Sequence, residues 1–295
     1  MKKLVFTGSG VAIVTPMHPD GSINYLQLGQ LIEWQIAEGT DAIIICGTTG
    51  ESSTMSDEEH IECIRYTVEY TAGRVPVIAG AGSNDTAYAI WLSIESKRVG
   101  ADALLQVTPY YNKTSQRGMI KHFTDIADST DLPVIIYNVP SRTGLNIKPE
   151  TYLALSRHPN IVATKEAGGN ISEIAKTASL CGDDLIIYSG NDDQTIPLMS
   201  LGGKGVISVV ANVAPRAMHE MTQLYLVGKT AEAARAQLDL IELCDAMFCD
   251  VNPIPVKCAL NLMGKNAGSV RMPLVDLAST QKEQVLTALK KYSLM

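Results

Sequence analysis

The 295-residue sequence lacks the cysteine spacing of a disulfide framework or a zinc site. Its six cysteines form no CxxC pair and are scattered through apolar stretches. None of the five histidines occurs in the HExxH spacing of a metalloprotease. We therefore expect free, mostly buried thiols and no bound metal.

Long apolar runs and basic clusters are also missing. No stretch of about 18 uninterrupted apolar residues occurs, so we expect no membrane-spanning helix. The segment MKKLVFTGSG has two lysines before apolar residues, but Gly8 and Gly10 interrupt the run, so we expect no export and a cytoplasmic protein. The formal net charge is −7 and no run of Lys and Arg appears, which argues against nucleic acid as a partner.

The glycine-rich segments do not match nucleotide-binding motifs. GGKG at residues 202–205 lacks the spacing and the following Ser or Thr of a phosphate-binding loop. GAG at residues 80–82 lacks the third glycine of a dinucleotide fingerprint. We interpret both segments as turns.

The composition is that of a globular chain with a large buried core, since 46% of the residues are hydrophobic and 19% are charged. Short apolar runs rich in β-branched residues recur eight times, and segments with helical periodicity lie between them. The predicted strands are residues 11–14, 42–46, 77–79, 103–107, 134–137, 161–164, 185–188 and 206–209. The clearest predicted crossover helices are residues 25–38, 56–71 and 86–99.

Eight apolar strands followed by amphipathic segments predict an α/β fold, a (β/α)8 TIM barrel whose parallel strands are buried on both faces. A doubly wound open sheet is the alternative. Only helical patterns follow the eighth strand, at residues 215–227, 230–249, 254–263 and 280–292. We therefore predict a catalytic barrel over residues 1–228 and a C-terminal helical segment over residues 229–295.

Lys165 directly follows the predicted sixth strand, at the end of the barrel where enzymes of this fold place their active sites. A lysine delivered into a dry interior tends to lose its proton. That tendency suits a nucleophile, because at the unperturbed pKa of about 10.4 only about one lysine in a thousand is neutral near pH 7.4. The alternative is a structural lysine that reaches solvent or pairs with Glu51 or Glu166.

Tyr137 ends the neighbouring predicted strand, and parallel neighbours lie about 4.8 Å apart, so its phenol can reach the same pocket as Lys165. A phenol can move protons if its pKa is lowered or if a chain of hydroxyls relays to it. Thr48 and Tyr111 could form such a chain. Taken singly, each of these residues is more often a packed or strand-end side chain.

Four motifs stand in order at the strand ends: GTTGES at 47–52, TPYYNK at 108–113, YNVPSRTG at 137–144 and KEAGG at 165–169. With them the sequence resembles the dihydrodipicolinate synthase and N-acetylneuraminate lyase superfamily, from the first strand through VNPIPVK at 251–257. Within it, the chain looks like the dihydrodipicolinate synthase family of lyases. The resemblance implies condensation of pyruvate with L-aspartate 4-semialdehyde through a lysine Schiff base, giving 4-hydroxy-tetrahydrodipicolinate on the diaminopimelate route to lysine.

The resemblance also assigns catalytic roles. Lys165 would form the Schiff base, and Tyr137, Thr48 and Tyr111 would form the proton relay. Tyr111 would enter from a neighbouring subunit, so the protein would be a homo-oligomer. Relatives usually form a homotetramer built from two tight dimers, although some are dimers. No cofactor or metal is implied, because the protonated Schiff-base nitrogen is itself the electron sink.

Two substrate carboxylates need partners in this scheme. Arg142 would hold the carboxylate of aspartate semialdehyde, since a guanidinium group forms paired hydrogen bonds to carboxylates. Thr49 and the backbone around Gly190 and Ile207 would bind the carboxylate of pyruvate.

Lysine-inhibited relatives have an allosteric pocket at the dimer interface, made of two histidines, an asparagine, a glutamate and a tyrosine. Here Asp57 and Tyr88 stand in place of the first histidine and the glutamate. We predict a vestigial pocket with weak or absent lysine feedback, and the alternative is a set of ordinary interface residues. Its predicted members are Ser52, Asp57, His60, Asn84, Tyr88 and Tyr110.

Two other functions remain open at this point. A related pyruvate-dependent aldolase such as N-acetylneuraminate lyase would share Lys165 and Tyr137 but not the role of Arg142. A non-catalytic barrel that only binds keto acids is the second alternative, and the presence of every expected catalytic residue argues against it.

Overall fold

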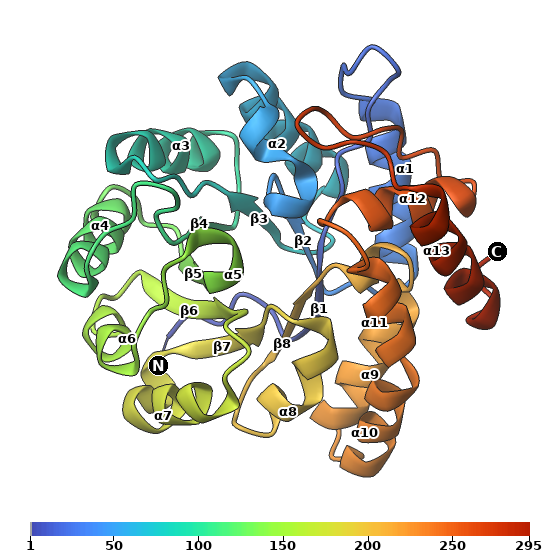
Figure 1. The fold of residues 1–295 in the computed structure, drawn as a ribbon. Coiled ribbons are helices and arrows are strands. Elements are labelled where there is room, and N and C mark those ends of the chain that lie inside the picture. Colours follow the sequence, from blue (N-terminus) through green and yellow to red (C-terminus); the bar gives the residue numbers. More distant parts are fainter. Residues whose placement is uncertain (1) are drawn as a thin grey trace.

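A closed barrel of eight parallel strands forms the centre of the molecule in the computed structural model, which describes residues 2–295 (Figure 1). The strands follow one another around the barrel in sequence order, and β8 pairs with β1 to close it. The predicted (β/α)8 barrel is therefore confirmed, and the open sheet was wrong. The strands are β1 (Gly8–Ala12), β2 (Ala42–Ile45), β3 (Val77–Gly80), β4 (Ala103–Val107), β5 (Val134–Asn138), β6 (Ile161–Glu166), β7 (Ile186–Ser189) and β8 (Gly205–Ser208).

Helices surround the strands, and the last helices gather on one side of the barrel near α1 (Figure 1). The helices between strands are α1 (Tyr25–Ala37), α2 (Asp57–Thr71), α3 (Thr86–Arg98), α4 (Gln116–Asp128), α5 (Pro140–Thr143), α6 (Pro149–Leu155), α7 (Ile171–Cys181) and α8 (Thr195–Met199). After β8 come α9 (Pro215–Leu226), α10 (Thr230–Asp239), α11 (Ile241–Met247), α12 (Ile254–Leu262) and α13 (Ser279–Lys291). Two short 3-10 helices, η1 (Thr48–Gly50) and η4 (Asp192–Gln194), follow β2 and β7.

Side-chain caps explain why several predicted helix boundaries agree with the structure. Helix α2 begins with a capping box, in which the Ser56 hydroxyl accepts from the Glu59 backbone N–H and the Glu59 carboxylate accepts from the Ser56 N–H. The predicted helix at 230–249 is instead two helices, α10 and α11, which meet at Leu240. The predicted division at residue 228 falls in the turn between α9 and α10 and stays a prediction.

The first strand lies at Gly8–Ala12, so the prediction at residues 11–14 found the strand but placed its bounds too late in the sequence. The start of this strand was not recognised because it contains Gly8 and Gly10, whereas β-branched residues are the sequence signal for a strand. The structure needs Gly10, since a Cβ there would lie 2.9 Å from the Phe6 ring and 2.8 Å from Ile44. Phe6 in turn stacks on Tyr188 with ring centroids 4.4 Å apart, inside the barrel.

Strand residues alternate between the barrel interior and the layer beneath the helices, as the pleat requires. Ile44 belongs to the interior cluster, whereas Ile43 and Ile45 pack in the layer between strands and helices. On β6, Ala163 is an interior residue, so Lys165, two positions further, also faces the interior. The same alternation carries the Lys165 side chain to the mouth of the barrel.

A buried ion pair connects the C-terminal helices to the barrel mouth. Lys257 of α12 is 1% exposed and donates to Glu51 Oε1 at 2.8 Å, to the Thr15 carbonyl at 3.0 Å and to the Ser269 carbonyl at 2.6 Å. The other oxygen of Glu51 accepts from the Arg271 backbone N–H at 2.9 Å. Because Glu51 directly follows η1, this pair fixes the loop that carries Thr48 and Thr49.

Replacing Lys257 by methionine should lower the free energy of unfolding by about 3–5 kcal/mol, because the Glu51 carboxylate would stay buried without its cation. Equilibrium denaturation with urea measures the change. The double variant Lys257→Met, Glu51→Gln is the control, and it should recover much of the loss because both charges are removed. A Lys257→Met protein that unfolds at the wild-type midpoint would contradict the prediction.

Candidate active site

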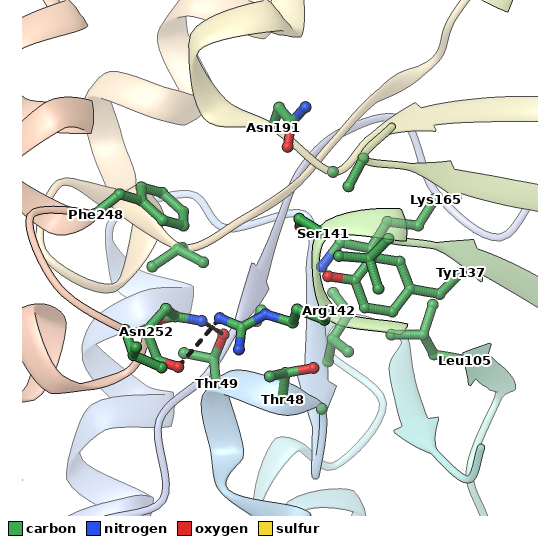
Figure 2. Close-up of a pocket in the computed structure, with 18 of the residues that line it drawn as sticks. Thr48, Thr49, Leu105, Tyr137, Ser141, Arg142, Lys165, Asn191, Phe248 and Asn252 are labelled. Atoms are coloured by element: carbon green, nitrogen blue, oxygen red, sulfur yellow. Dashed lines mark hydrogen bonds between the residues drawn. The ribbon is translucent and has the colours of Figure 1, made fainter. Parts of the chain in front are cut away.

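A cavity of about 360 Å³ opens at the carboxyl ends of the strands (Figure 2). Segments that follow β2, β5, β6 and β7 line it, and the loop between α11 and α12 closes one side. Six of the eight predicted catalytic and substrate-binding residues line this cavity. They are Thr48, Thr49, Tyr137, Arg142, Lys165 and Gly190.

Lys165 is held in the cavity wall by its strand and is only 5% exposed. Its pKa is lowered to about 8, mainly because burial disfavours the charged amine; the Asp192 carboxylate opposes this change, and the nearby Arg142 guanidinium adds to it. With that pKa about one Lys165 in five is neutral near pH 7.4, against about one in a thousand for an exposed lysine. The structure thus supplies a reactive amine.

The alternative of a structural Lys165 paired with Glu51 or Glu166 does not match these contacts. Glu51 pairs with Lys257, and Glu166 accepts from Tyr152 Oη at 2.8 Å and from the Gly168 N–H at 2.7 Å. Within residues 2–295, no hydrogen bond or ion pair engages the Lys165 amine. Its nitrogen lies 4.3 Å from the centre of the Tyr137 ring instead.

Tyr137 is the register partner of Lys165 across β5 and β6, as strand adjacency predicted. Its pKa is raised to about 12, mainly by burial; the Arg142 guanidinium opposes the rise, and the Glu166 carboxylate adds to it. Of the two ways in which the phenol could move protons, a lowered pKa is therefore not favoured, and a relay through neighbouring hydroxyl groups stays a prediction. The phenol keeps its proton at neutral pH, so it can donate one to a reacting oxygen, and a partner hydroxyl must return it.

Arg142 and Thr49 share a partner that the sequence did not indicate. Arg142 Nη2 donates to the Asn252 carbonyl at 3.2 Å, and Asn252 Nδ2 donates to Thr49 Oγ1 at 3.0 Å, as the dashed lines in Figure 2 show. Asn252 lies in the loop between α11 and α12, within the VNPIPVK segment. In the sequence, this segment served only to show how far the family resemblance extends, and it did not indicate a role for Asn252.

Asp192 is a second functional group that sequence reasoning missed. It is fully buried in η4, where it accepts from Ser208 Oγ at 2.5 Å, the Val209 N–H at 3.1 Å and the Val210 N–H at 3.3 Å. Burial raises its pKa, and these hydrogen bonds oppose that rise. Its negative charge favours the protonated form of Lys165 and, by the same Coulomb attraction, a cationic Schiff base. No motif or spacing in the sequence marks it.

Two predicted residues lie outside the cavity lining. Tyr111 is 92% exposed and has a positive φ of 66°. Ile207 is buried in β8 as part of the interior core, and a backbone contact from it to a carboxylate stays a prediction.

A second cavity of about 490 Å³ contains most of the predicted vestigial pocket. Ser52, His60, Tyr88 and Tyr110 line it, and Thr48, Tyr137 and Arg142 face both cavities. Tyr88 donates its hydroxyl proton to Asp57 Oδ1 at 2.5 Å, and His60 Nε2 lies 2.7 Å from the Gly80 carbonyl oxygen. Asp57 and Asn84 do not line this cavity, and the Asn84 carbonyl accepts from Asn112 Nδ2 at 3.0 Å.

The described part of the chain contains no group of three or more His, Cys, Asp and Glu side chains placed to hold a metal ion. Across residues 2–295, every helix is too short or too polar to cross a bilayer.

Known proteins resemble this chain over nearly its whole length. It matches the dihydrodipicolinate synthetase family over residues 5–292. It is 58% identical to the 4-hydroxy-tetrahydrodipicolinate synthase of Thermoanaerobacter sp. (strain X514) over 292 residues, 99% of this chain and 98% of the relative. A solved monomeric dihydrodipicolinate synthase variant superimposes with a TM-score of 0.96 at 41% identity, covering 99% of this chain and 98% of that one. The lysine-bound enzyme from Cyanidioschyzon merolae gives a TM-score of 0.96 at 40% identity, with 99% and 100% coverage.

The lowered pKa of Lys165 predicts how its reaction with a small keto acid depends on pH. The rate of borohydride-trapped adduct formation with pyruvate should rise about tenfold per pH unit below pH 8 and level off above it, because the neutral amine is the nucleophile. Quenched trapping between pH 6 and about 10, followed by mass spectrometry, measures this profile. A rate that keeps rising to pH 10 would mean an unshifted lysine.

Proposed function

The chain belongs to the dihydrodipicolinate synthetase family, and we propose that the cavity around Lys165 is where it condenses pyruvate with L-aspartate 4-semialdehyde. The activity is that of a lyase that forms 4-hydroxy-tetrahydrodipicolinate. One observation carries the assignment of the site: a buried amine with a pKa of about 8 lies in the same cavity as the Arg142 guanidinium.

In the proposed first half-reaction, the neutral Lys165 nitrogen attacks the keto carbon of pyruvate. Tyr137 donates its proton to the carbinolamine oxygen, which leaves as water, and a cationic imine remains. Thr49 and the backbone at Gly190 are placed in the cavity wall to bind the carboxylate of pyruvate. The Tyr137 phenolate then takes a proton from the methyl group of the imine, which restores the phenol, and the resulting neutral enamine is the carbon nucleophile.

The second half-reaction needs a site for the aldehyde substrate. We propose that Arg142 holds its carboxylate, because the guanidinium lies in the cavity and, within residues 2–295, forms a hydrogen bond only to the Asn252 carbonyl. The enamine carbon then attacks the aldehyde carbon and forms the new C–C bond. A sugar-acid aldolase or a non-catalytic barrel is not favoured, because the named relatives at 58% identity are synthases.

Borohydride reduction with pyruvate should place a stable adduct on Lys165, as peptide mapping would detect. Lys165→Ala should abolish the adduct and lower turnover by on the order of 10³-fold or more, since the covalent route is lost. Lys204→Ala, which removes an exposed lysine before β8, is the matched control and should keep both. An adduct on any other lysine would overturn the mechanism.

We propose that the protein acts as a homotetramer made of two tight dimers, with the dimer as the minimum active unit. The position of Tyr111 supports this, since its 92% exposed side chain lies outside its own cavity. A tyrosine in that position is available to complete the proton relay of a neighbouring subunit. One solved relative is a monomeric variant, so the proposal rests on this chain's own Tyr111.

A cytoplasmic location is also part of the proposal. The six cysteines are free thiols, and four of them are buried. Thiols in this state are typical of proteins kept in a reducing compartment.

We propose that lysine inhibits this enzyme weakly or not at all. A solved relative from Cyanidioschyzon merolae contains bound lysine. In this chain Tyr88 stands where lysine-inhibited relatives have a glutamate, and its hydroxyl donates a hydrogen bond to the nearby Asp57 carboxylate. The ammonium group of a bound lysine would therefore lack a free negative partner.

Initial-rate measurements with added L-lysine should give an apparent dissociation constant above about 1 mM. The variant Tyr88→Glu restores a carboxylate in the second cavity and should increase lysine sensitivity, whereas Tyr88→Gln should not. Strong inhibition of the wild type at micromolar lysine would refute the proposal.

A further inference from the structure

The carboxylate of Glu166 is buried directly behind Tyr137 and Lys165. Asn138 and Glu166 are register partners on β5 and β6, one position after the register partners Tyr137 and Lys165. Successive side chains of a strand point to opposite faces, so Asn138 and Glu166 lie on the outer face of the barrel wall. Glu166 accordingly contacts Tyr152 of α6, which lies outside β6 (Figure 1). A contact on this outer face therefore fixes the same two strand ends that carry the reacting groups.

Three neutral groups donate hydrogen bonds to this carboxylate. Asn138 Nδ2 lies 3.0 Å from Oε1 and 3.1 Å from Oε2, Tyr152 Oη donates to Oε2 at 2.8 Å, and the Gly168 N–H donates to Oε1 at 2.7 Å. An ionised carboxylate only accepts hydrogen bonds, whereas a protonated one needs an acceptor for its proton. Tyr152 Oη already accepts from Thr164 Oγ1 at 3.0 Å, so its own proton is directed at Glu166. The arrangement therefore fits the charged form of Glu166.

The charge of Glu166 has no cationic partner among residues 2–295. Burial raises the pKa of its carboxyl group, the three hydrogen bonds oppose the rise, and the Glu173 carboxylate of α7 adds to it. This charge in turn acts on the phenol of Tyr137, whose pKa is raised mainly by burial; the Arg142 guanidinium opposes that rise, and Glu166 adds to it. The Lys165 nitrogen is the other ionisable group beside this ring, at 4.3 Å from its centre.

We propose that Glu166 is a positioning residue that holds the ends of β5 and β6 together and whose negative charge makes the Tyr137 phenolate a stronger base toward the methyl group of the imine. This inference rests on the proposed function and adds to it a group that touches neither substrate. Gly168 permits the arrangement, because a Cβ at that position would lie 2.6 Å from Glu166 Oε1.

The phenol has two tasks, and a nearby negative charge affects them in opposite directions. In the first task, Tyr137 donates its proton to the carbinolamine oxygen, which leaves as water, and the charge makes the phenol a weaker acid. In the second task, the phenolate takes a proton from the methyl carbon. The electron pair of that C–H bond forms the C=C bond of the enamine, and the C=N bond of the imine becomes a single bond. The charge speeds this step, because it makes the phenolate a stronger base.

The test measures the two tasks separately in Glu166→Gln, which removes the charge and keeps the size of the side chain. In D2O without the second substrate, reversible enamine formation replaces the methyl protons of pyruvate by deuterium, because the Tyr137 phenol exchanges its own proton with the solvent. Proton NMR should show this replacement slowed by about five- to tenfold, as expected when one nearby charge is removed. The rate of borohydride-trapped imine formation on Lys165 should stay equal or increase.

Two further variants test whether the charge is responsible. Glu166→Asp keeps the charge and should exchange methyl protons within about threefold of the wild-type rate. Glu150→Gln removes an exposed carboxylate from the first turn of α6 and is the matched control, so both rates should stay unchanged. Equal slowing of both tasks in Glu166→Gln would mean that Glu166 only packs in the barrel wall. An unchanged exchange rate would mean that its charge does not act on Tyr137.

Tyr152→Phe tests the same charge if Glu166→Gln does not fold. The variant removes one donor from the carboxylate, so Glu166 should take up a proton at a higher pH than in the wild type. Its exchange rate, divided by that of the wild type at the same pH, should therefore be lower at about pH 6 than at about pH 8. A ratio that is equal at the two pH values would contradict the inference.

The wild type separates this inference from the proposed function. A wild-type protein that forms no pyruvate adduct on Lys165 would reject the function itself. A wild type that forms the adduct and exchanges the methyl protons, together with a Glu166→Gln variant that matches it in both rates, would reject only the role of Glu166.

Discussion

The site depends on a lysine amine that the fold buries without a hydrogen-bond or ion-pair partner among residues 2–295. The chain contains a direct comparison, because Lys165 and Lys257 are both buried, and burial lowers the pKa of each. Lys257 contacts a carboxylate and two carbonyl groups and serves as an ionic anchor. Lys165 has a tyrosine ring beside it and only a more distant charge from Asp192, so it can give up its proton. The same residue type is structural or reactive according to the groups that surround it.

Much of the barrel and the pairing of Tyr137 with Lys165 could be predicted from the sequence. Seven strands are recognisable in the sequence as apolar, β-branched runs. Tyr137 and Lys165 end neighbouring strands of a parallel barrel, which is why they could be predicted to lie side by side. The strand that begins at Gly8 was misplaced because packing against Phe6 requires glycine, which carries no strand signal. The division of one predicted helix at Leu240 was missed for a similar reason, since no proline or glycine marks it.

The groups that tune the site could not be predicted from spacing. Asn252 reaches Thr49 across 203 positions of sequence, and Asp192 acts on Lys165 from the next strand's loop. Their contacts depend on how the C-terminal segment and the 3-10 turns pack, and no local pattern encodes that packing. Whether the pKa of Tyr137 is raised or lowered also could not be predicted from the sequence, because the shift depends on how completely the ring is buried and on the positions of Arg142 and Glu166.

The two cavities have side chains in common, since Thr48, Tyr137 and Arg142 border both. A molecule bound in the second cavity would therefore contact these three side chains of the first cavity directly, without a relay through distant helices. For inhibitor design, the side chains common to the two cavities offer one target. A compound with a keto-acid group in the first cavity and an aromatic group in the second cavity would contact both cavities at once.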